Sequence, residues 1–369
     1  MKGTVLIAAL VAGLLVALLA LLSDGQPLTR PVSPVVSEAA IATSSTAPRR
    51  AQSAAVRVNR LVADAQTSSP TYTSLYARLG RNGEVPRVRR EQLDSYLTKH
   101  HRSVGALLGA LRASGDDALL KEAMERFPDD PRVQFAAAYK ADSAGERQQW
   151  LEKFKRSDPE NSLANYLLAG EHLQAGRIEA ALQELAAAGG KAGFDNHLRE
   201  FVQDAEEAYH AAGFSEAEAK GTACWTALLP ELTRLKQVSI DLVDLAKRYD
   251  QAGDTAAAQA VREMGMNLGR RLDQPGQTTL IQALVGSAIE RIILNSMDPN
   301  APYGDSGLTP KGAADAIAAR RKSLRELADR TEPILLNLPD SELAHFYDRL
   351  KMYGEVAALR WVVNQAPTP

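Results

Sequence analysis

The chain has 369 residues, of which 45% are hydrophobic but only 5% aromatic, and its formal net charge is −2. The length allows one large domain or two smaller ones, and an interior made mostly of alanine and leucine suits packed helices better than a β-sandwich. The near-neutral charge offers no basic excess for nucleic acid. The single cysteine, Cys224, excludes an intramolecular disulfide framework and a cysteine-based zinc site.

Residues 5–22, VLIAALVAGLLVALLALL, form an unbroken apolar run. A membrane-spanning helix needs about 20 such residues, whereas the core of a signal peptide has about 7–15. The length therefore favours a single-pass transmembrane anchor, with a long signal peptide as the alternative. Lys2 precedes the run and Asp24 follows it, so residues 1–4 are expected in the cytoplasm and the remainder across the membrane. By analogy with bacterial envelope proteins, that side is the periplasm.

Residues 23–90 are rich in proline, serine, threonine and alanine and show no sustained apolar period. Such a segment buries too little surface to offset the entropy lost on ordering. We expect a flexible linker that holds the folded part away from the bilayer.

Residues 91–272 contain helical segments that stop at a glycine and resume at once. A glycine just past a helix end adopts the left-handed conformation at low cost and closes the helix. The first five of these glycines are 30, 31, 37 and 40 residues apart, which is typical of stacked helical hairpins. The predicted hairpin turns are Gly115, Gly145, Gly176, Gly213 and Gly253, with a last one at Gly354.

Residues 162–185 carry a resemblance to the tetratricopeptide repeat family. Leu168 stands where the motif has a large apolar residue, and Gly176 stands at its turn. Ala181 occupies the small position, and Leu185 the second large apolar position. The usual aromatic, glycine and tyrosine of the motif are replaced by Asn165, Ala169 and His172. The resemblance covers residues 92–270 and, more weakly, 341–364. It implies an all-α solenoid of antiparallel helix hairpins that binds another protein or a peptide in a concave groove. Candidate groove residues are Tyr139, Asn165, Tyr166, Glu171 and His172.

Residues 273–369 interrupt the glycine series and predict a less regular helical part. The apolar segment 278–294 contains Glu290 and Arg291, so it is expected to be a core helix rather than a second membrane span. A polar loop follows over 295–310, then an amphipathic helix and a final hairpin around Gly354.

The sequence contains no phosphate-binding glycine loop and no nucleophile elbow. His100 and His101 are adjacent and so do not face the same side of a helix. His197 and Glu200, with Glu206, Glu207 and His210 on later turns, would hold a metal only with a further ligand; a solvated helix face is the favoured interpretation. Cys224 is interpreted as a buried structural thiol. We therefore predict no catalytic, cofactor-binding or metal-binding residue.

Three hypotheses follow for the function. The preferred one is a membrane-tethered helical scaffold that binds a protein or peptide, with the membrane contacted through residues 5–22. The second is a structural or assembly element of an envelope complex without a discrete ligand. The third, an enzyme with a site near residues 295–310, is supported only by the departure of that region from the repeat. The sequence does not indicate an oligomeric state.

Overall fold

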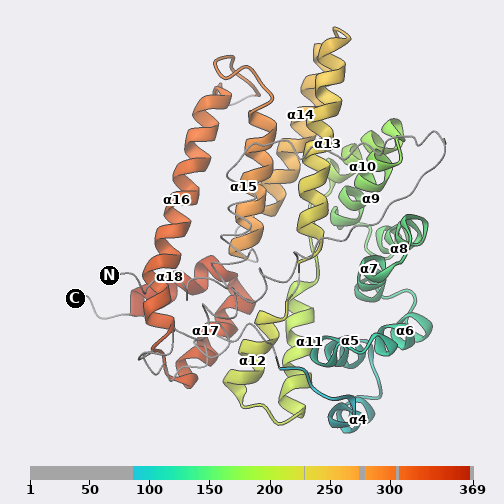
Figure 1. The fold of residues 1–369 in the computed structure, drawn as a ribbon, viewed down its shortest axis with the longest axis vertical. Helices are drawn as coiled ribbons and strands as arrows, with labels where there is room; N and C mark the ends of the chain where they lie inside the picture. Colours follow the sequence, from blue (N-terminus) through green and yellow to red (C-terminus); the bar gives the residue numbers. More distant parts are fainter. Residues whose placement is uncertain (1–85, 228, 274–278, 305–306, 366–369) are drawn as a thin grey trace, which may run out of the picture.

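The computed structural model describes residues 86–227, 229–273, 279–304 and 307–365, and within them the chain is an all-α domain of 15 helices packed largely as consecutive pairs (Figure 1). The helices are α4 (Arg90–Lys99), α5 (Val104–Ser114), α6 (Asp117–Arg126), α7 (Pro131–Lys140), α8 (Ala144–Ser157), α9 (Leu163–Gln174), α10 (Ile178–Gly190), α11 (Leu198–Ala211), α12 (Glu216–Trp225), α13 (Glu231–Gln251), α14 (Thr255–Leu272), α15 (Leu280–Leu294), α16 (Pro310–Leu335), α17 (Asp340–Tyr353) and α18 (Glu355–Gln365).

Most of the predicted hairpin turns are confirmed. Helices α5 and α6, α9 and α10, α11 and α12, α13 and α14, and α17 and α18 pack as consecutive pairs, and a glycine with positive φ lies between the two helices of each pair. In chain order these glycines are Gly115 (φ 73°), Gly176 (72°), Gly213 (96°), Gly253 (81°) and Gly354 (82°). An L-residue with a Cβ is disfavoured at such φ values, so each glycine ends one helix and lets the chain reverse.

The turn predicted at Gly145 is wrong. Helices α7 and α8 do form a hairpin, but α7 ends at Lys140, α8 begins at Ala144, and Gly145 lies in the first turn of α8. The Ser143 hydroxyl caps α8 by accepting a hydrogen bond from the backbone N–H of Glu146 (3.1 Å). A serine N-cap starts the second helix here, so the turn needs no left-handed glycine.

These two kinds of glycine predict opposite effects of alanine. Gly145→Ala should raise the free energy of unfolding by about 0.5 kcal/mol, because the position is helical and no atom lies within 4 Å of the added Cβ. Gly176→Ala should lower the free energy of unfolding by about 1 kcal/mol. Open space surrounds this position too, but its φ of +72° is unfavourable for a residue with a Cβ. Urea unfolding of the two full-length variants checks this, and effects of the same sign would contradict the assigned turn.

The helix pairs do not form a simple linear stack, because two later helices return to earlier ones. Helix α11 packs along α5, and α13 packs along α9, although many residues separate the partners in sequence. Glycines make both approaches close: a Cβ on Gly109 of α5 would meet the backbone of Asp204 in α11, and one on Gly170 of α9 would lie 2.9 Å from Val238 in α13. Helices α5 and α9, the first helices of their hairpins, are therefore covered by later helices of the same chain.

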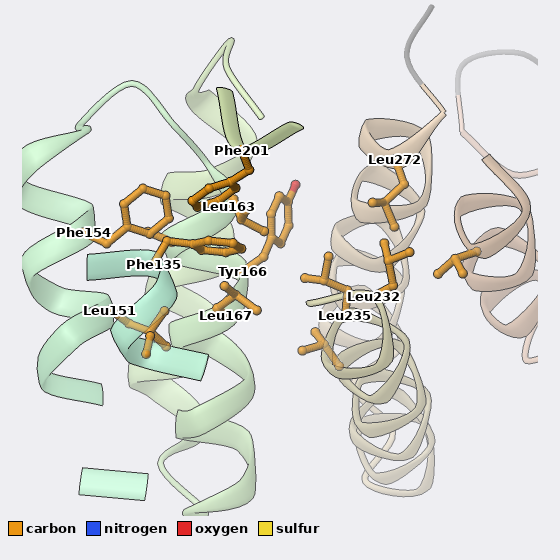
Figure 2. Packing of buried hydrophobic residues seen from close by; sticks show 14 of the residues in the cluster. Phe135, Leu151, Phe154, Leu163, Tyr166, Leu167, Phe201, Leu232, Leu235 and Leu272 are labelled. Atoms are coloured by element: carbon orange, nitrogen blue, oxygen red, sulfur yellow. The ribbon is translucent and has the colours of Figure 1, made fainter. Parts of the chain in front are cut away.

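Helix α9 lies at the centre of this arrangement. Helices α8, α10 and α13 all pack against it, and its residues from Leu163 to His172 are buried on every side. Figure 2 shows the side chains of α7, α8 and α9 on one side, with Phe201 of α11 beside them, and Leu232, Leu235 and Leu272 of α13 and α14 on the other. The Phe135 ring centroid lies 5.6 Å from that of Phe154 and 6.2 Å from that of Phe201.

The C-terminal part is helical, and its packing continues that of the preceding hairpins. Helix α15 lies along α14 and also contacts α13, which confirms that segment 278–294 supplies a core helix. Gly269 and Gly286 face one another across the α14–α15 contact, where a Cβ on Gly286 would lie 2.6 Å from the Gly269 carbonyl oxygen. A second apolar cluster joins α12 to α16, α17 and α18; its buried members include Leu335, Leu343, Phe346 and Leu359.

The predicted anchor at residues 5–22 and most of the predicted linker lie outside the described residues. The end of the linker was placed too late: Val88 is buried, with 4% of its surface exposed, and Arg90 already begins α4 and forms an ion pair with Asp116 (2.5 Å). Among the helices of the described residues, none combines the length and the apolar character that a bilayer crossing requires.

Candidate functional site

The candidate groove residues Tyr139 and Glu171 meet at a polar junction between α9 and α13. Arg147 of α8 donates from Nε to Glu171 Oε1 (2.7 Å) and from Nη2 to Oε2 (3.3 Å), and Arg234 of α13 donates from Nη1 to Oε1 (3.1 Å). The Arg234 guanidinium carbon lies 5.9 Å from the centre of the Tyr139 ring. We call Tyr139, Arg147, Glu171 and Arg234 the α9–α13 junction.

The side chains of this junction are mostly covered. Only 5% of the Glu171 side chain and 16% of the Arg147 side chain are exposed, against 33% for Arg234. A buried carboxylate between two guanidinium groups is well compensated, because charge-assisted and paired hydrogen bonds replace its lost hydration. The junction therefore ties α8 and α13 to α9 and carries one excess positive charge towards the Arg234 edge.

A second buried carboxyl lies close by, at the first residue of α13. Glu231 has 1% of its surface exposed; its Oε1 accepts a hydrogen bond from Asn196 Nδ2 (2.7 Å), and its Oε2 has no partner in the described part of the chain. Burial raises the pKa of Glu231 to about 7. Burial, with the charge of Glu231, also raises the pKa of Tyr139, whose buried hydroxyl likewise lacks a partner among the described residues.

The remaining groove candidates are also held within the fold. Asn165 donates to Glu184 (2.7 Å) and accepts from Lys191 (2.5 Å). Tyr166 is 1% exposed, and its ring centroid lies 6.2 Å from that of Phe194. His172 Nδ1 accepts from Arg177 Nε (3.0 Å), and burial together with that guanidinium lowers the pKa of the imidazole.

These positions correct the expectation of an open groove at α7 and α9. Asn165, Tyr166, Glu171 and His172 are buried, and Tyr139 is half-buried with its hydroxyl enclosed. The physical reason is that α10 and α13 both pack on α9: Asn165 and His172 contact the α10 side, and Glu171 contacts α13. In this arrangement the side chains bind helices of their own chain together.

Sequence reasoning missed Arg147, Arg234, Glu231 and Asn196. Glu231 directly follows Pro230, so its position reads as an ordinary acidic residue in the first turn of a helix. Only the fold, which brings the start of α13 against Asn196 in the connection before α11, reveals that its carboxyl is buried.

The residues considered with His197 as metal ligands are not brought together as a set, and Cys224 lies between the two apolar clusters. Glu206 forms an ion pair with Lys351 (2.6 Å), and His210 is exposed, so neither joins His197. His197 is nevertheless buried, at 9% exposed, rather than part of a solvated face. Cys224 packs against both apolar clusters, and burial raises the pKa of its thiol to about 12, in keeping with a structural thiol.

The loop expected to hold the alternative enzymatic site packs on the domain and also forms local contacts in its described residues. Arg262 of α14 donates from Nε to Ser296 Oγ (3.2 Å) and from Nη2 to the Ser296 carbonyl oxygen (3.0 Å), and Met297 and Tyr303 pack against the main apolar cluster. The backbone N–H of Asn300 donates to Asp298 Oδ1 (3.0 Å), and that of Tyr303 donates to the Leu308 carbonyl oxygen (3.1 Å). The two groups of three potential metal ligands in the described residues lie elsewhere, on the α8–α10 side and at the start of α11. Comparison with protein-family models, with curated proteins and with solved structures found no match for this chain.

Proposed function

We propose that this chain is a membrane-tethered helical scaffold of the cell envelope, similar to tetratricopeptide repeat proteins, that binds another protein or a peptide. The observation that carries the proposal is the packing of the described helices as consecutive pairs. Stacked helical pairs are rigid and present long surfaces, and proteins built from them commonly bind other proteins. Residues 5–22 supply the attachment to the membrane.

The partner surface in this proposal lies on the outside of the helix pairs. Helices α11 and α13 already cover α5 and α9, so a partner at the inner face would have to displace them. Outer positions remain open: Gln149 on α8 is exposed, and Met352 and Tyr353 at the end of α17 are large apolar residues with 48% and 51% of their surface exposed.

Site-specific photo-crosslinking tests this proposal. The full-length chain, with a photoreactive residue at Gln149 or Met352, is irradiated in membranes of the cell that makes it. A discrete heavier product containing a second protein is expected from at least one exposed position. The same residue placed at Leu168, which is fully buried, should give no product.

Two outcomes would overturn the scaffold proposal. Products that contain only copies of this chain would favour the structural-element hypothesis. The absence of any product at either exposed position would leave no partner on the faces to which the proposal assigns it.

Carbonate washing of the same membranes separates an uncleaved anchor, which stays in the pellet, from a chain released by signal-peptide cleavage.

A further inference from the structure

A buried histidine and three carboxylates meet where the chain leaves the α9–α10 hairpin and enters α11. Asp158 directly follows α8, Asp195 and His197 lie in the connection to α11, and Glu200 is in the first turn of α11. His197 Nε2 lies 3.6 Å from Asp158 Oδ2, and His197 Nδ1 lies 3.8 Å from Asp195 Oδ2.

Only 11% of the His197 side chain is exposed, and yet it makes no hydrogen bond among the described residues; its Nε2 is buried without a partner there. Both carboxylate contacts exceed hydrogen-bonding distance, and a buried polar group without a partner is costly. The 3.8 Å between His197 Nδ1 and Asp195 Oδ2 is instead close to the spacing of two ligands on one cation, because bonds of about 2.1 Å at a tetrahedral angle separate the ligand atoms by about 3.4 Å.

We propose that Asp195, His197 and Glu200 bind a divalent transition-metal cation such as Zn²⁺. One ligand atom from each residue lies within 4.8 Å of the other two, so a small adjustment brings all three to one ion. Asp195 is already oriented: its Oδ1 accepts the backbone N–H of His197 (2.8 Å), which leaves Oδ2 for the metal. With Nδ1 on the metal, Nε2–H faces Asp158 Oδ2 at 3.6 Å, and a small shift would bring it within donating distance of this carboxylate, the usual kind of partner of a metal-bound histidine.

The local charge favours a cation. Three carboxylates surround the imidazole, and in the described part of the chain no lysine or arginine forms an ion pair with any of them. This negative charge outweighs the partial positive charge of the α11 N-terminus. An imidazole ligand with two carboxylates suits Zn²⁺ or Mn²⁺, whereas Mg²⁺ and Ca²⁺ prefer oxygen ligands alone.

A second group of similar composition, Glu152, His172 and Glu184, lacks this property. Lys155 forms ion pairs with Glu184 (2.7 Å) and Glu152 (3.0 Å), and Arg177 donates to His172 Nδ1. A metal there would have to displace a lysine and compete with an arginine. This group therefore supplies a matched control.

Binding at the proposed site would fix the position of α11. The three ligands belong to α11 and the connection before it, and Asp158 belongs to the end of α8. A bound ion would therefore fasten α11, which packs along α5, to the end of α8. This is a structural rather than a catalytic role.

Metal binding to the full-length protein tests the proposal. Protein purified in detergent, stripped with EDTA and dialysed into metal-free buffer is titrated with Zn²⁺, Mn²⁺ or Mg²⁺ by calorimetry. One high-affinity equivalent of Zn²⁺ is expected, with a rise in the melting temperature. Glu200→Gln should weaken this binding at least tenfold, Asp158→Asn about tenfold, and Glu152→Gln should leave it unchanged.

Circular dichroism of the metal-free variants shows whether they are folded. His197→Asn is a further variant, because asparagine tolerates the left-handed backbone at this position (φ 54°). Should it fail to fold, the partly exposed Glu200 and Asp158 still decide the question. The absence of saturable Zn²⁺ binding, or equal affinity in the wild type and Glu200→Gln, would overturn the proposal.

Discussion

Gly109→Ala is expected to lower the free energy of unfolding by about 3 kcal/mol. The added Cβ would lie 2.1 Å from the backbone oxygen of Asp204 and 2.6 Å from its carbonyl carbon. These are backbone atoms of a packed helix, so α5 and α11 must move apart along their contact. The gain of up to about 1 kcal/mol from replacing a helical glycine by alanine is too small to offset this overpacking.

Two other glycines calibrate this result in urea unfolding of the full-length chain. Gly189→Ala, inside α10 with no atom within 4 Å of the new Cβ, should be neutral or slightly stabilising. Gly105→Ala should have an intermediate effect, because its nearest neighbour, at 2.5 Å, is the carboxylate of Asp204, which can rotate away. A Gly109→Ala effect as small as that of Gly189→Ala would contradict the close contact of α5 with α11.

The α5–α11 contact also bears on where the proposed scaffold would bind a partner. In a linear stack each helix pair contacts only its neighbours, and its inner face stays open. In this chain α11 and α13 close that face, and the α9–α13 junction holds α13 there through Arg234 and Glu171. The expected crosslinks therefore belong to the outer faces, and a crosslink from the inner face would require these helices to detach.

Local signals explain how much of the fold could be predicted from the sequence. A left-handed glycine at a helix end is encoded by one residue, so the hairpins at Gly115, Gly176, Gly213, Gly253 and Gly354 were recognisable. Gly145 misled because it follows a small residue, as Gly115, Gly176, Gly213 and Gly253 do, although Ser143 with Glu146 three residues later is itself a helix-start signal. That signal places the turn two residues before the glycine.

Contacts between distant segments explain what could not be predicted. Gly105 and Gly109 lie one turn apart on α5 and mark a close approach, but nothing in the sequence identifies α11 as the partner. In the candidate site, Arg147 reaches Glu171 from the neighbouring helix α8, but Arg234 joins them only because α13 returns to α9. Groove residues inferred from the repeat pattern were therefore placed on faces that other helices cover.

Glu231→Gln is expected to remove a large part of the pH dependence of stability near neutral pH. Burial raises the pKa of this carboxyl from 4.5 to about 7, with Asn196 as its hydrogen-bond donor and Arg112 as the nearby cation that opposes the shift. Between these pH values the folded chain retains a proton that the unfolded chain has released. The free energy of unfolding therefore falls as pH rises through this window, by about 3 kcal/mol in total.

Glutamine does not titrate, so the variant loses this slope. At pH 8 Glu231→Gln should be more stable than the wild type by up to about 3 kcal/mol, and near pH 4.5 the two should be similar, because glutamine keeps an oxygen that accepts from Asn196. Asp204, whose pKa burial raises to about 6, contributes with the same sign in a lower window, so Asp204→Asn should remove the slope between about pH 4 and pH 6 instead. Urea unfolding of the full-length chain from pH 4.5 to pH 8 distinguishes the two windows. Parallel curves for the wild type and Glu231→Gln would mean that the Glu231 carboxyl is hydrated in the folded protein, which would contradict its burial beside Asn196 at the start of α13.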